Sequence, residues 1–382
     1  MKPVLLITRN FPPLVGGMER LVGNIYKQVN SRAPCDLIGP AGSKRHCDDN
    51  SRVYECPVRP LPWFLLTVLF NTLRASLGRR YTLCIAGSGM TGLFALLAAR
   101  INRAPCIVFI HGLDLIVKNR LYQSVFVPAI RRSDLVIVNS KNTGALAAAA
   151  GIRQERMVVL HPGVDLPAQS AQAGNFRRQH NLQNNSLLLS VGRLIPRKGI
   201  AEFIQHALPN IVSAFPDTVL VIIGDEPADA LVSGGPVLAA IRQAIEATGL
   251  YDHILLLGRV DEPVLTAAYA DADCLVFPLR AVDGDVEGFG MVAVEAAAHG
   301  LPTVAFDEGG VGDAIEHGKS GLLVPAGDYQ AFSSAVRGLL NGEPASLSAE
   351  TCRAHAASFH WDNFGDKLQQ ILHGCTTEKA SR

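Results

Sequence analysis

Two glutamates eight residues apart are the sharpest chemical feature of the sequence. Glu287 stands before a Gly-Phe-Gly turn, and Glu295 follows about two helical turns later. The residues between Gly290 and Glu295 are apolar or small, which predicts a largely buried helix. A buried carboxylate must be paired or must bind a polar ligand. We expect Glu295 to accept a sugar diol, Glu287 to face a reacting group, and the helix start at 288–290 to offer amides to an anion.

Two cations follow an apolar run earlier in the chain. Arg193 comes directly after the run 187–191, and Lys198 lies five residues further on. The guanidinium offers a planar fork of donors and the ammonium a point charge, so together they suit a diphosphate. The alternative interpretation is a pair of solvated loop charges.

Two weaker candidates lie nearer the start of the chain. Phe11-Pro-Pro-Leu-Val is followed by Gly16 and Gly17 and then by a helical pattern over 18–28. A glycine loop that leads into a helix can bind an anion, although the G-x-G-x-x-G pattern is absent and a plain turn is the alternative. His111 ends another apolar run beside Gly112. It could contact a substrate hydroxyl or move a proton, and a purely structural histidine is the alternative.

Two acidic pairs have a spacing that can hold Mg²⁺, namely Asp271-Ala-Asp273 and Asp283-Gly-Asp285. The first pair comes just before the apolar run 274–277, where helix-to-strand turns are commonly acidic, so we favour a structural role. Because Arg193 and Lys198 can neutralise a diphosphate, we expect neither a metal nor another cofactor. Gly-x-Ser-x-Gly is absent around Ser140, so a hydrolase elbow is not expected.

The elements that must position these residues alternate between short apolar runs and longer segments with helical spacing. Near-continuous apolar strands separated by helices predict parallel sheets covered on both faces. The fold class is therefore α/β, with two doubly wound domains whose default ligand site is the cleft between them. We expect six strands in each domain: 4–8, 35–39, 83–86, 106–111, 135–139 and 157–161, then 187–191, 219–224, 254–258, 274–278, 303–306 and 321–324.

The length of 382 residues allows two or three domains. The stretch 167–186 is polar and lacks an apolar run, which is typical of a linker. We expect domains over 1–166 and 187–360, and a helix in the C-terminal segment 361–382 that is amphipathic over 361–372.

Charge is distributed unevenly along the chain. Lys and Arg number 35 and Asp and Glu 34, and this near-neutral total argues against a nucleic-acid partner. Residues 1–166, however, carry 21 basic against 9 acidic side chains, or about +12, and the remainder carries 14 against 25, or about −11. The basic half suggests an anionic surface or polyanionic ligand. A generally solvated surface is the alternative.

An apolar body over 63–70 is followed by Arg74, Arg79 and Arg80. This pattern favours an interfacial helix on anionic lipid, and a core helix with exposed arginines is the alternative. No apolar stretch approaches the ~20 residues of a membrane span, and no signal peptide is evident. None of the eight cysteines forms a C-x-x-C pair. We expect a cytoplasmic protein, peripheral at the inner face of the cytoplasmic membrane.

Together these motifs resemble those of the retaining glycosyltransferases of family 4, which have two Rossmann-like domains facing across a cleft, the GT-B fold. The resemblance covers nearly the whole chain, and the Glu-x₇-Glu element is its most specific part. Where the family often has Pro-Asn-Gly-Val-Asp, this chain has His161-Pro-Gly-Val-Asp165. The other motifs that carry the resemblance are 11–19, His111-Gly112, Val191-Gly-Arg193, Lys198-Gly199, 309–311 and 318–324.

The resemblance implies that 1–166 is the acceptor side, that 187–360 binds the nucleotide-sugar donor, and that the helix in 361–382 crosses back to the first domain. It also implies roles for particular residues. Arg193 and Lys198 would hold the donor diphosphate, and Glu295 would bind the nucleotide ribose. His111 and Glu287 would contact the sugar. The remaining donor contacts implied in this way are Gly16 and Gly17 at the diphosphate, the backbone of Arg259 and Val260 at the base, and the amides near Phe289 and Gly290 at the sugar.

The implied activity is transfer of a sugar from a UDP- or GDP-sugar to a lipid-linked or polysaccharide acceptor of the lipopolysaccharide type, with retention of configuration and without a metal. The alternatives are a nucleotide-sugar epimerase on the same fold and a non-catalytic nucleotide-sugar-binding protein. The presence of Glu287 with Glu295 argues against the epimerase, and the complete set of donor-site residues argues against the binding protein.

Overall fold

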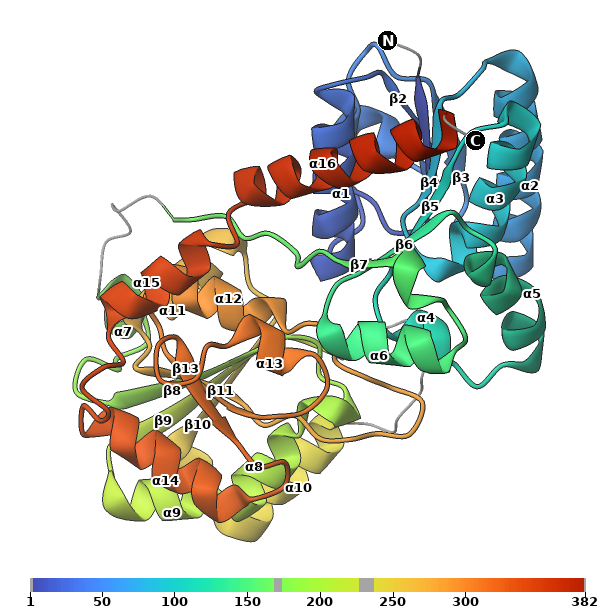
Figure 1. Cartoon of the computed structure of the whole chain (residues 1–382). Coiled ribbons are helices and arrows are strands. Elements are labelled where there is room, and N and C mark those ends of the chain that lie inside the picture. Colours follow the sequence, from blue (N-terminus) through green and yellow to red (C-terminus); the bar gives the residue numbers. More distant parts are fainter. Residues whose placement is uncertain (1–2, 168–173, 227–236, 381–382) are drawn as a thin grey trace. The chain divides into compact units, whose positions relative to one another are not determined.

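The computed structural model describes residues 3–167, 174–226 and 237–380. Two compact units make up the chain, Met1–Gly163 together with Trp361–Arg382, and Val164–His360 (Figure 1). Each unit is built on a parallel sheet, so the predicted pair of doubly wound α/β domains is confirmed. The first unit ends three residues before the predicted boundary at 166.

The first unit contains a seven-stranded sheet in the order β3-β2-β1-β4-β5-β6-β7. The order reverses between β1 and β4, and ligands of open parallel sheets bind at such switch points. We predicted six strands, and β3 is the additional one. Its residues are mostly half-exposed at the sheet edge, so it has no continuous apolar run to announce it. The strands are β1 Val4–Ile7, β2 Cys35–Pro40, β3 Val53–Cys56, β4 Leu83–Ala86, β5 Cys106–Ile110, β6 Leu135–Val138 and β7 Met157–Val159.

The C-terminal helix α16, Trp361–Ala380, belongs to this first unit. It packs against α1, Gly17–Asn30, and its Trp361, Phe364 and Leu368 join the core beneath that helix. The other helices of the unit are α2 Leu61–Gly78, α3 Gly92–Asn102, α4 Leu113–Ile116, α5 Arg120–Arg131 and α6 Lys141–Ala149.

The second unit has the six predicted strands, in the order β10-β9-β8-β11-β12-β13. They are β8 Ser186–Val191, β9 Thr218–Ile223, β10 Ile254–Gly258, β11 Cys274–Phe277, β12 Thr303–Phe306 and β13 Gly321–Val324. The helices are α7 Asn175–Gln179, α8 Ile200–His206, α9 Leu208–Ala214, α10 Val237–Thr248, α11 Glu262–Asp271, α12 Met291–Ala298, α13 Val311–Ala314, α14 Tyr329–Leu340 and α15 Ala349–Ala357.

Part of the predicted linker 167–186 is folded into the second unit. Residues 168–173 lie outside the described residues, but α7 follows and buries Phe176 in the core. Asp271 accepts hydrogen bonds from the amides of Gly174 and Arg177, and Asp273 pairs with the Arg177 guanidinium at 2.8 Å. This acidic pair therefore has the structural role that we favoured, because both carboxylates fasten α7 to the connection between α11 and β11.

Helix α2 buries one apolar face and exposes another. Its inner face buries Phe64 and Val68. On the outer face, successive exposed residues are three or four positions apart, which places them in one line along the helix. We call this set the α2 stripe: Trp63, Leu66, Phe70, Leu73 and Leu77, between 39% and 80% exposed. The inner face thus agrees with the core-helix alternative, and the outer face is apolar and exposed. No helix among the described residues is long and apolar enough to cross a membrane.

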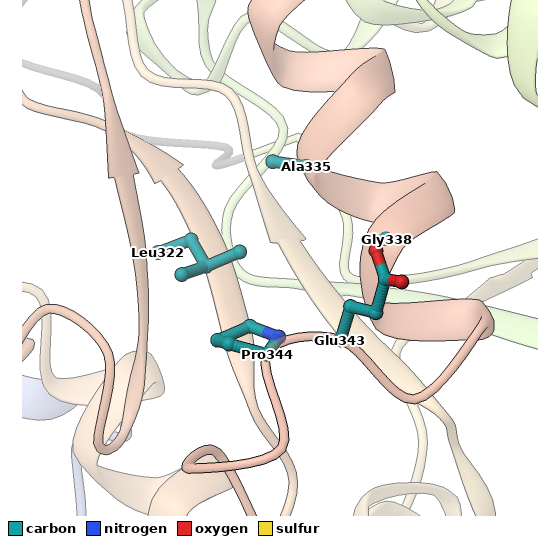
Figure 2. A pocket seen from close by; sticks show the side chains of 5 residues that line it. All are labelled: Leu322, Ala335, Gly338, Glu343 and Pro344. Atoms are coloured by element: carbon teal, nitrogen blue, oxygen red, sulfur yellow. The ribbon is translucent and has the colours of Figure 1, made fainter.

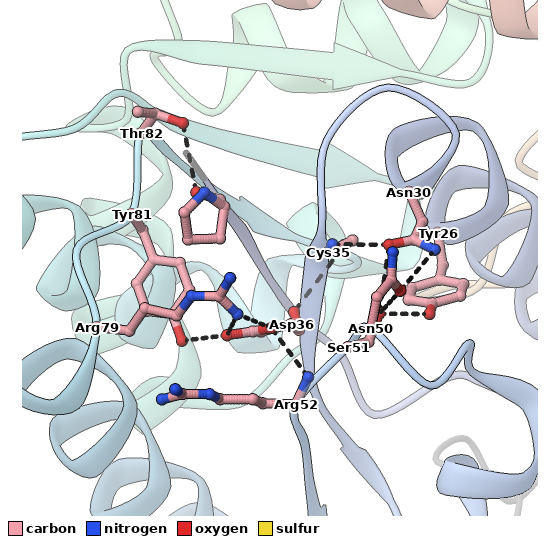
Figure 3. Close-up of polar contacts among 11 residues, drawn as sticks. Tyr26, Asn30, Cys35, Asp36, Asn50, Ser51, Arg52, Arg79, Tyr81 and Thr82 are labelled. Atoms are coloured by element: carbon pink, nitrogen blue, oxygen red, sulfur yellow. Dashed lines mark hydrogen bonds and ion pairs between the residues drawn. The ribbon is translucent and has the colours of Figure 1, made fainter. Parts of the chain in front are cut away.

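A buried carboxylate fastens the end of α2 to the sheet (Figure 3). Asp36 on β2 is fully buried and accepts hydrogen bonds from Arg79 at 2.9 Å, from the Tyr81 hydroxyl at 2.8 Å and from the Arg52 amide at 2.9 Å. Arg79 follows the last turn of α2. Asp36 lies near the start of its strand, so the network stands at the amino edge of the sheet. Of the three arginines predicted to face lipid, Arg79 is therefore engaged inside the protein.

Candidate functional site

In the second unit, the carboxyl ends of parallel strands bring the predicted donor-site residues to one edge of the sheet. Arg193 follows β8, and Arg259 with Val260 follows β10. Glu287 stands in the segment between β11 and α12. Because all six strands run in the same direction, these positions share the edge where ligands of such sheets bind.

The centre of the site is an ion pair between Lys198 and Glu287. The Lys198 ammonium donates to Glu287 Oε2 at 2.8 Å and lies 4.4 Å from the centre of the Phe277 ring. A second cation, Arg197, approaches the same oxygen at 3.4 Å and approaches Asp285 at 3.7 Å. Arg197 is only 7% exposed. The second acidic pair that we considered as a metal site, 283–285, therefore supplies a partner for a buried arginine.

The cations hold Glu287 in its charged form. Burial raises the pKa of this carboxyl, but Lys198, Arg197 and Arg193 more than offset burial and lower the pKa to about 2. Burial also lowers the pKa of Lys198, which Glu287 partly counteracts. Lys198 and Arg197 are therefore matched by Glu287 and Asp285, and a third cation, Arg193, stands exposed beside them. An anion that reaches this edge meets an excess of positive charge.

Glycines let the backbone close tightly around the cluster. Gly199 has φ +64°, and a side chain there would overlap the carbonyl oxygen of Pro278. Gly309 has φ +66°, and a Cβ atom would lie 2.8 Å from the Glu287 carbonyl oxygen. The amide of Gly310 donates to that same oxygen at 2.8 Å. The Gly309-Gly310 motif thus fixes the backbone of Glu287.

Helix α12 begins at the glycine turn and carries Glu295 in its second turn. Gly290 caps the helix with φ +93°, and the Phe289 ring is buried 5.7 Å from the ring of Phe359. Glu295 is half-buried and accepts a hydrogen bond from the Tyr269 hydroxyl at 3.2 Å. The predicted, largely buried helix is confirmed, and Tyr269 holds the carboxylate of Glu295 on it.

Two cavities among the described residues of the second unit differ in size and lining. A small one of about 10 Å³, room for about one water molecule, is lined by residues that include Arg193, Lys198 and Phe277. A larger one of about 440 Å³ lies between β13 and α14 (Figure 2). The larger cavity has one acidic side chain, Glu343, and no cation, so it does not suit a diphosphate. The cation-lined edge remains the candidate site.

In the first unit, the Gly16-Gly17 loop is exposed and leads directly into α1. Glu19, in the first turn of that helix, accepts a hydrogen bond from Asn10 at 2.7 Å. This bond ties the start of the helix to the end of β1. The amides of the helix start are consequently held at the carboxyl edge of the sheet, where an anion can approach them.

His111 is 9% exposed and its orientation is fixed by backbone contacts. Its Nε2 lies 2.8 Å from the carbonyl oxygen of Gly87. Since a carbonyl oxygen only accepts, this contact favours the tautomer in which Nε2 carries the proton and Nδ1 can accept. Asp114 accepts from the amides of His111 and Gly89 and so joins the turns after β5 and β4. The arrangement can offer Nδ1 to a hydroxyl group.

The structure thus joins Lys198 with Glu287 directly, and places Arg193 close enough to affect both pKa values. Gly16, Gly17 and His111 lie in the other unit. Sequence reasoning missed Arg197 and Tyr269. The only available signal for Arg197 was its place between Arg193 and Lys198, and nothing in the sequence linked Tyr269 to Glu295.

Comparison with known proteins assigns the chain to a family. The model described as "Glycosyltransferase Family 4" matches residues 15–167, and the model described as "Glycosyl transferases group 1" matches residues 173–357. Together they span most of both units, so both halves of the chain are accounted for.

Relatives and solved structures are similar over almost the whole chain. The GDP-mannose-dependent alpha-(1-6)-phosphatidylinositol monomannoside mannosyltransferase of Mycobacterium tuberculosis is 29% identical and covers 98% of this chain and 99% of its own. The Anabaena HepE protein in complex with UDP-glucose has a TM-score of 0.77 at 24% identity, covering 98% of this chain and 100% of its own. WaaG, a glycosyltransferase involved in lipopolysaccharide biosynthesis, has a TM-score of 0.69 at 18% identity, covering 97% of this chain and 100% of its own. The two structures agree with the fold, and the motifs and family matches together establish that this chain belongs to the family 4 glycosyltransferases.

Proposed function

We propose that the protein transfers a mannosyl or related sugar from a GDP-sugar to a lipid-linked acceptor, with retention of configuration and without a metal. The observation that carries this proposal is the Lys198–Glu287–Arg197 cluster at the carboxyl edge of a family 4 glycosyltransferase sheet. GDP-mannose as donor and a phosphoinositide glycolipid as acceptor are suggested by the nearly full-length mycobacterial relatives.

The cluster supports a specific chemical contribution. When the bond between the sugar C1 and the diphosphate oxygen breaks, negative charge builds on the departing nucleoside diphosphate. Arg193 and Lys198 stabilise that charge as it forms. The acceptor hydroxyl supplies the oxygen of the new bond to C1, and its proton passes to the departing diphosphate. Glu287 keeps Lys198 charged before the donor arrives, since the pKa of the lysine falls on burial and is raised again by this carboxylate. Glu295 binds the ribose, and the backbone near Arg259 and Val260 meets the base.

The assay we would use follows radiolabel from GDP-mannose into phosphatidylinositol monomannoside, with UDP-glucose as the second donor and a lipopolysaccharide core as the second acceptor. Transfer from the GDP-sugar into the glycolipid supports the proposal. Conversion of the donor without any acceptor would instead identify an epimerase. Nucleotide binding without transfer to any acceptor would identify a binding protein.

A thermal-shift panel of UDP, GDP and ADP, with Glu295→Ala beside the wild type, tests the donor site by itself. We expect GDP to raise the melting temperature of the wild type but not that of the variant, because a ligand stabilises a folded protein only if it binds to it. Chelation of divalent metals should leave the shift unchanged.

We propose that the first unit binds the enzyme to the anionic inner face of the cytoplasmic membrane. The α2 stripe offers exposed aromatic and aliphatic side chains, and residues 1–166 carry about +12. Arg74 and Arg80 are exposed near the end of the same helix. This combination of apolar and basic groups suits adsorption to an anionic bilayer surface.

Flotation with vesicles containing phosphatidylglycerol tests the membrane proposal. The double variant Trp63→Ser, Phe70→Ser should bind less, because it removes two of the largest exposed apolar groups. Tyr251→Ser is the matched control, since Tyr251 is 62% exposed in the second unit. Equal binding by the wild type and the double variant would refute a role for the stripe.

A further inference from the structure

A tyrosine and a histidine with no role so far enclose Glu295. Tyr269 lies on α11, is 3% exposed, and donates its hydroxyl to Glu295 Oε2 at 3.2 Å. Its ring is stacked on that of His299, with centres 5.1 Å apart and planes 21° apart. His299 follows the last turn of α12, the helix that carries Glu295. Two separate helices therefore meet at this carboxylate.

His299 is bonded to the backbone of the same glutamate. Its Nδ1 lies 2.9 Å from the carbonyl oxygen of Glu295, so Nδ1 carries the proton. Its Nε2 is buried and has no hydrogen-bond partner among the described residues. Burial lowers the pKa of His299 and outweighs the hydrogen bond to the Glu295 backbone and the charge of Glu262, which both raise it, while Arg353 lowers it further. The ring is consequently neutral near pH 7 and serves as a flat surface for Tyr269.

Glu295 is thus held at both its side chain and its backbone. A glutamate side chain on a helix has several rotamers, and fixing one of them on ligand binding costs free energy. A hydrogen bond that fixes the carboxylate beforehand reduces this cost, and a bond to a charged acceptor is stronger than a neutral one. A phenylalanine at position 269 would keep a ring to stack on His299 and would lose the hydroxyl that donates to Glu295.

We propose that Tyr269 is a positioning residue that orients the Glu295 carboxylate toward the ribose diol of the nucleotide, and that His299 holds the tyrosine ring in place. The proposal rests on the assignment of Glu295 to the ribose in the proposed function. Its distinctive consequence is that the Tyr269 hydroxyl matters only for nucleotides that carry the ribose hydroxyls.

The experiment is calorimetric titration of GDP and of 2′,3′-dideoxy-GDP into the wild type and into Tyr269→Phe. Losing one net hydrogen bond should weaken the binding of GDP to the variant about 3- to 10-fold. The dideoxy nucleotide should bind both proteins equally within about twofold, because it has no diol to place. Tyr329→Phe is the matched control, because Tyr329 also packs on a histidine, His206, at 5.2 Å in the same unit. It should leave both affinities unchanged.

A double-variant cycle adds a readout that a general structural defect would not mimic. In a Glu295→Ala background, Tyr269→Phe should cause no further loss of GDP affinity, since the two act as one unit. Additive losses would overturn the proposal. So would unchanged GDP binding by Tyr269→Phe, or an equal loss of GDP and dideoxy-GDP. If the wild type binds neither GDP nor UDP, the proposed function fails and this proposal fails with it, whereas the other contrary outcomes overturn the positioning role alone.

Discussion

In the second unit, the side chains of Arg197, Lys198 and Glu287 lie together, at most 14% exposed, at the carboxyl edge of the sheet, beside the candidate site. In the first unit, the buried carboxylate Asp36 lies at the amino edge and is used by Arg79 to fasten α2. The exposed groups of that unit, the α2 stripe and the basic side chains around it, face solvent instead. Two units built on parallel sheets therefore place their charged groups differently. The second unit gathers them beside the candidate site, and the first exposes basic side chains on its surface.

The difference teaches how each unit can meet an anion. A buried cluster has low local dielectric, so its charges interact strongly and are little screened by salt. Exposed arginines interact weakly one by one, and salt screens them. We expect single substitutions to have large effects in the cluster of the second unit and small, salt-dependent effects on the surface of the first.

The largest effect should follow from Lys198→Ala. Removing a charge that stabilises the departing diphosphate should lower turnover about 10²–10³-fold, as loss of an oxyanion donor does in other enzymes. Steady-state transfer assays measure it. Lys319→Ala is the control, because Lys319 pairs with Glu316 on the exposed surface of the same unit. Near-wild-type turnover of Lys198→Ala would remove this lysine from the donor site.

Next in size is the loss of stability in Glu287→Gln. It leaves Lys198 without its carboxylate and Arg197 with Asp285 alone, which should cost the second unit about 3 kcal/mol of unfolding free energy. Both tryptophans, Trp63 and Trp361, lie in the first unit, so their fluorescence should show an unchanged transition while circular dichroism shows a shifted one. A shift in the fluorescence transition would contradict the expectation that the destabilisation is confined to the second unit.

The same variant predicts a pH dependence. The pKa of Glu287 is about 2 in the folded protein against an ordinary value of 4.5. Its stabilising contribution is therefore present above about pH 4.5 and is lost as the pH falls toward about 2. The difference in unfolding free energy between wild type and Glu287→Gln should shrink from pH 5 to pH 3. A difference that stayed constant would show that Glu287 is not stabilised by its cations.

Much of the fold followed from the sequence, because buried strands of parallel sheets are continuous apolar runs. We did not predict edge strand β3, because Val53 and Tyr54 are only half-buried. We did not predict α7, because its five mostly polar residues show no helical periodicity. At the site, Lys198 and Glu287 were predictable because each follows a strand that ends at the same edge. Burial of Arg197 and the meeting of Tyr269 with Glu295 depend on packing between distant segments, which a single sequence does not reveal.

A smaller effect should follow from Asp36→Asn in the first unit. The amide removes the charge that pairs with Arg79 and accepts from the Tyr81 hydroxyl. We expect the unfolding free energy of the first unit to fall by about 2 kcal/mol. Tryptophan fluorescence should now report the shifted transition. GDP affinity should stay unchanged, because the network lies at the amino edge of the other sheet. Weakened GDP binding in this variant would mean that the two units do not divide these tasks.

The smallest effect should be that of Arg80→Gln on vesicle binding. An exposed arginine near an anionic surface contributes about 1 kcal/mol, so the partition coefficient should fall about fivefold at low salt. Arg337→Gln is the matched control, because it changes the net charge equally from an exposed position on α14 of the acidic second unit. Equal losses in both variants would show that total charge drives adsorption. A loss confined to Arg80→Gln, and abolished at high salt, would show that the basic face around α2 makes the contact, since only charges within a Debye length of the lipid are felt by it.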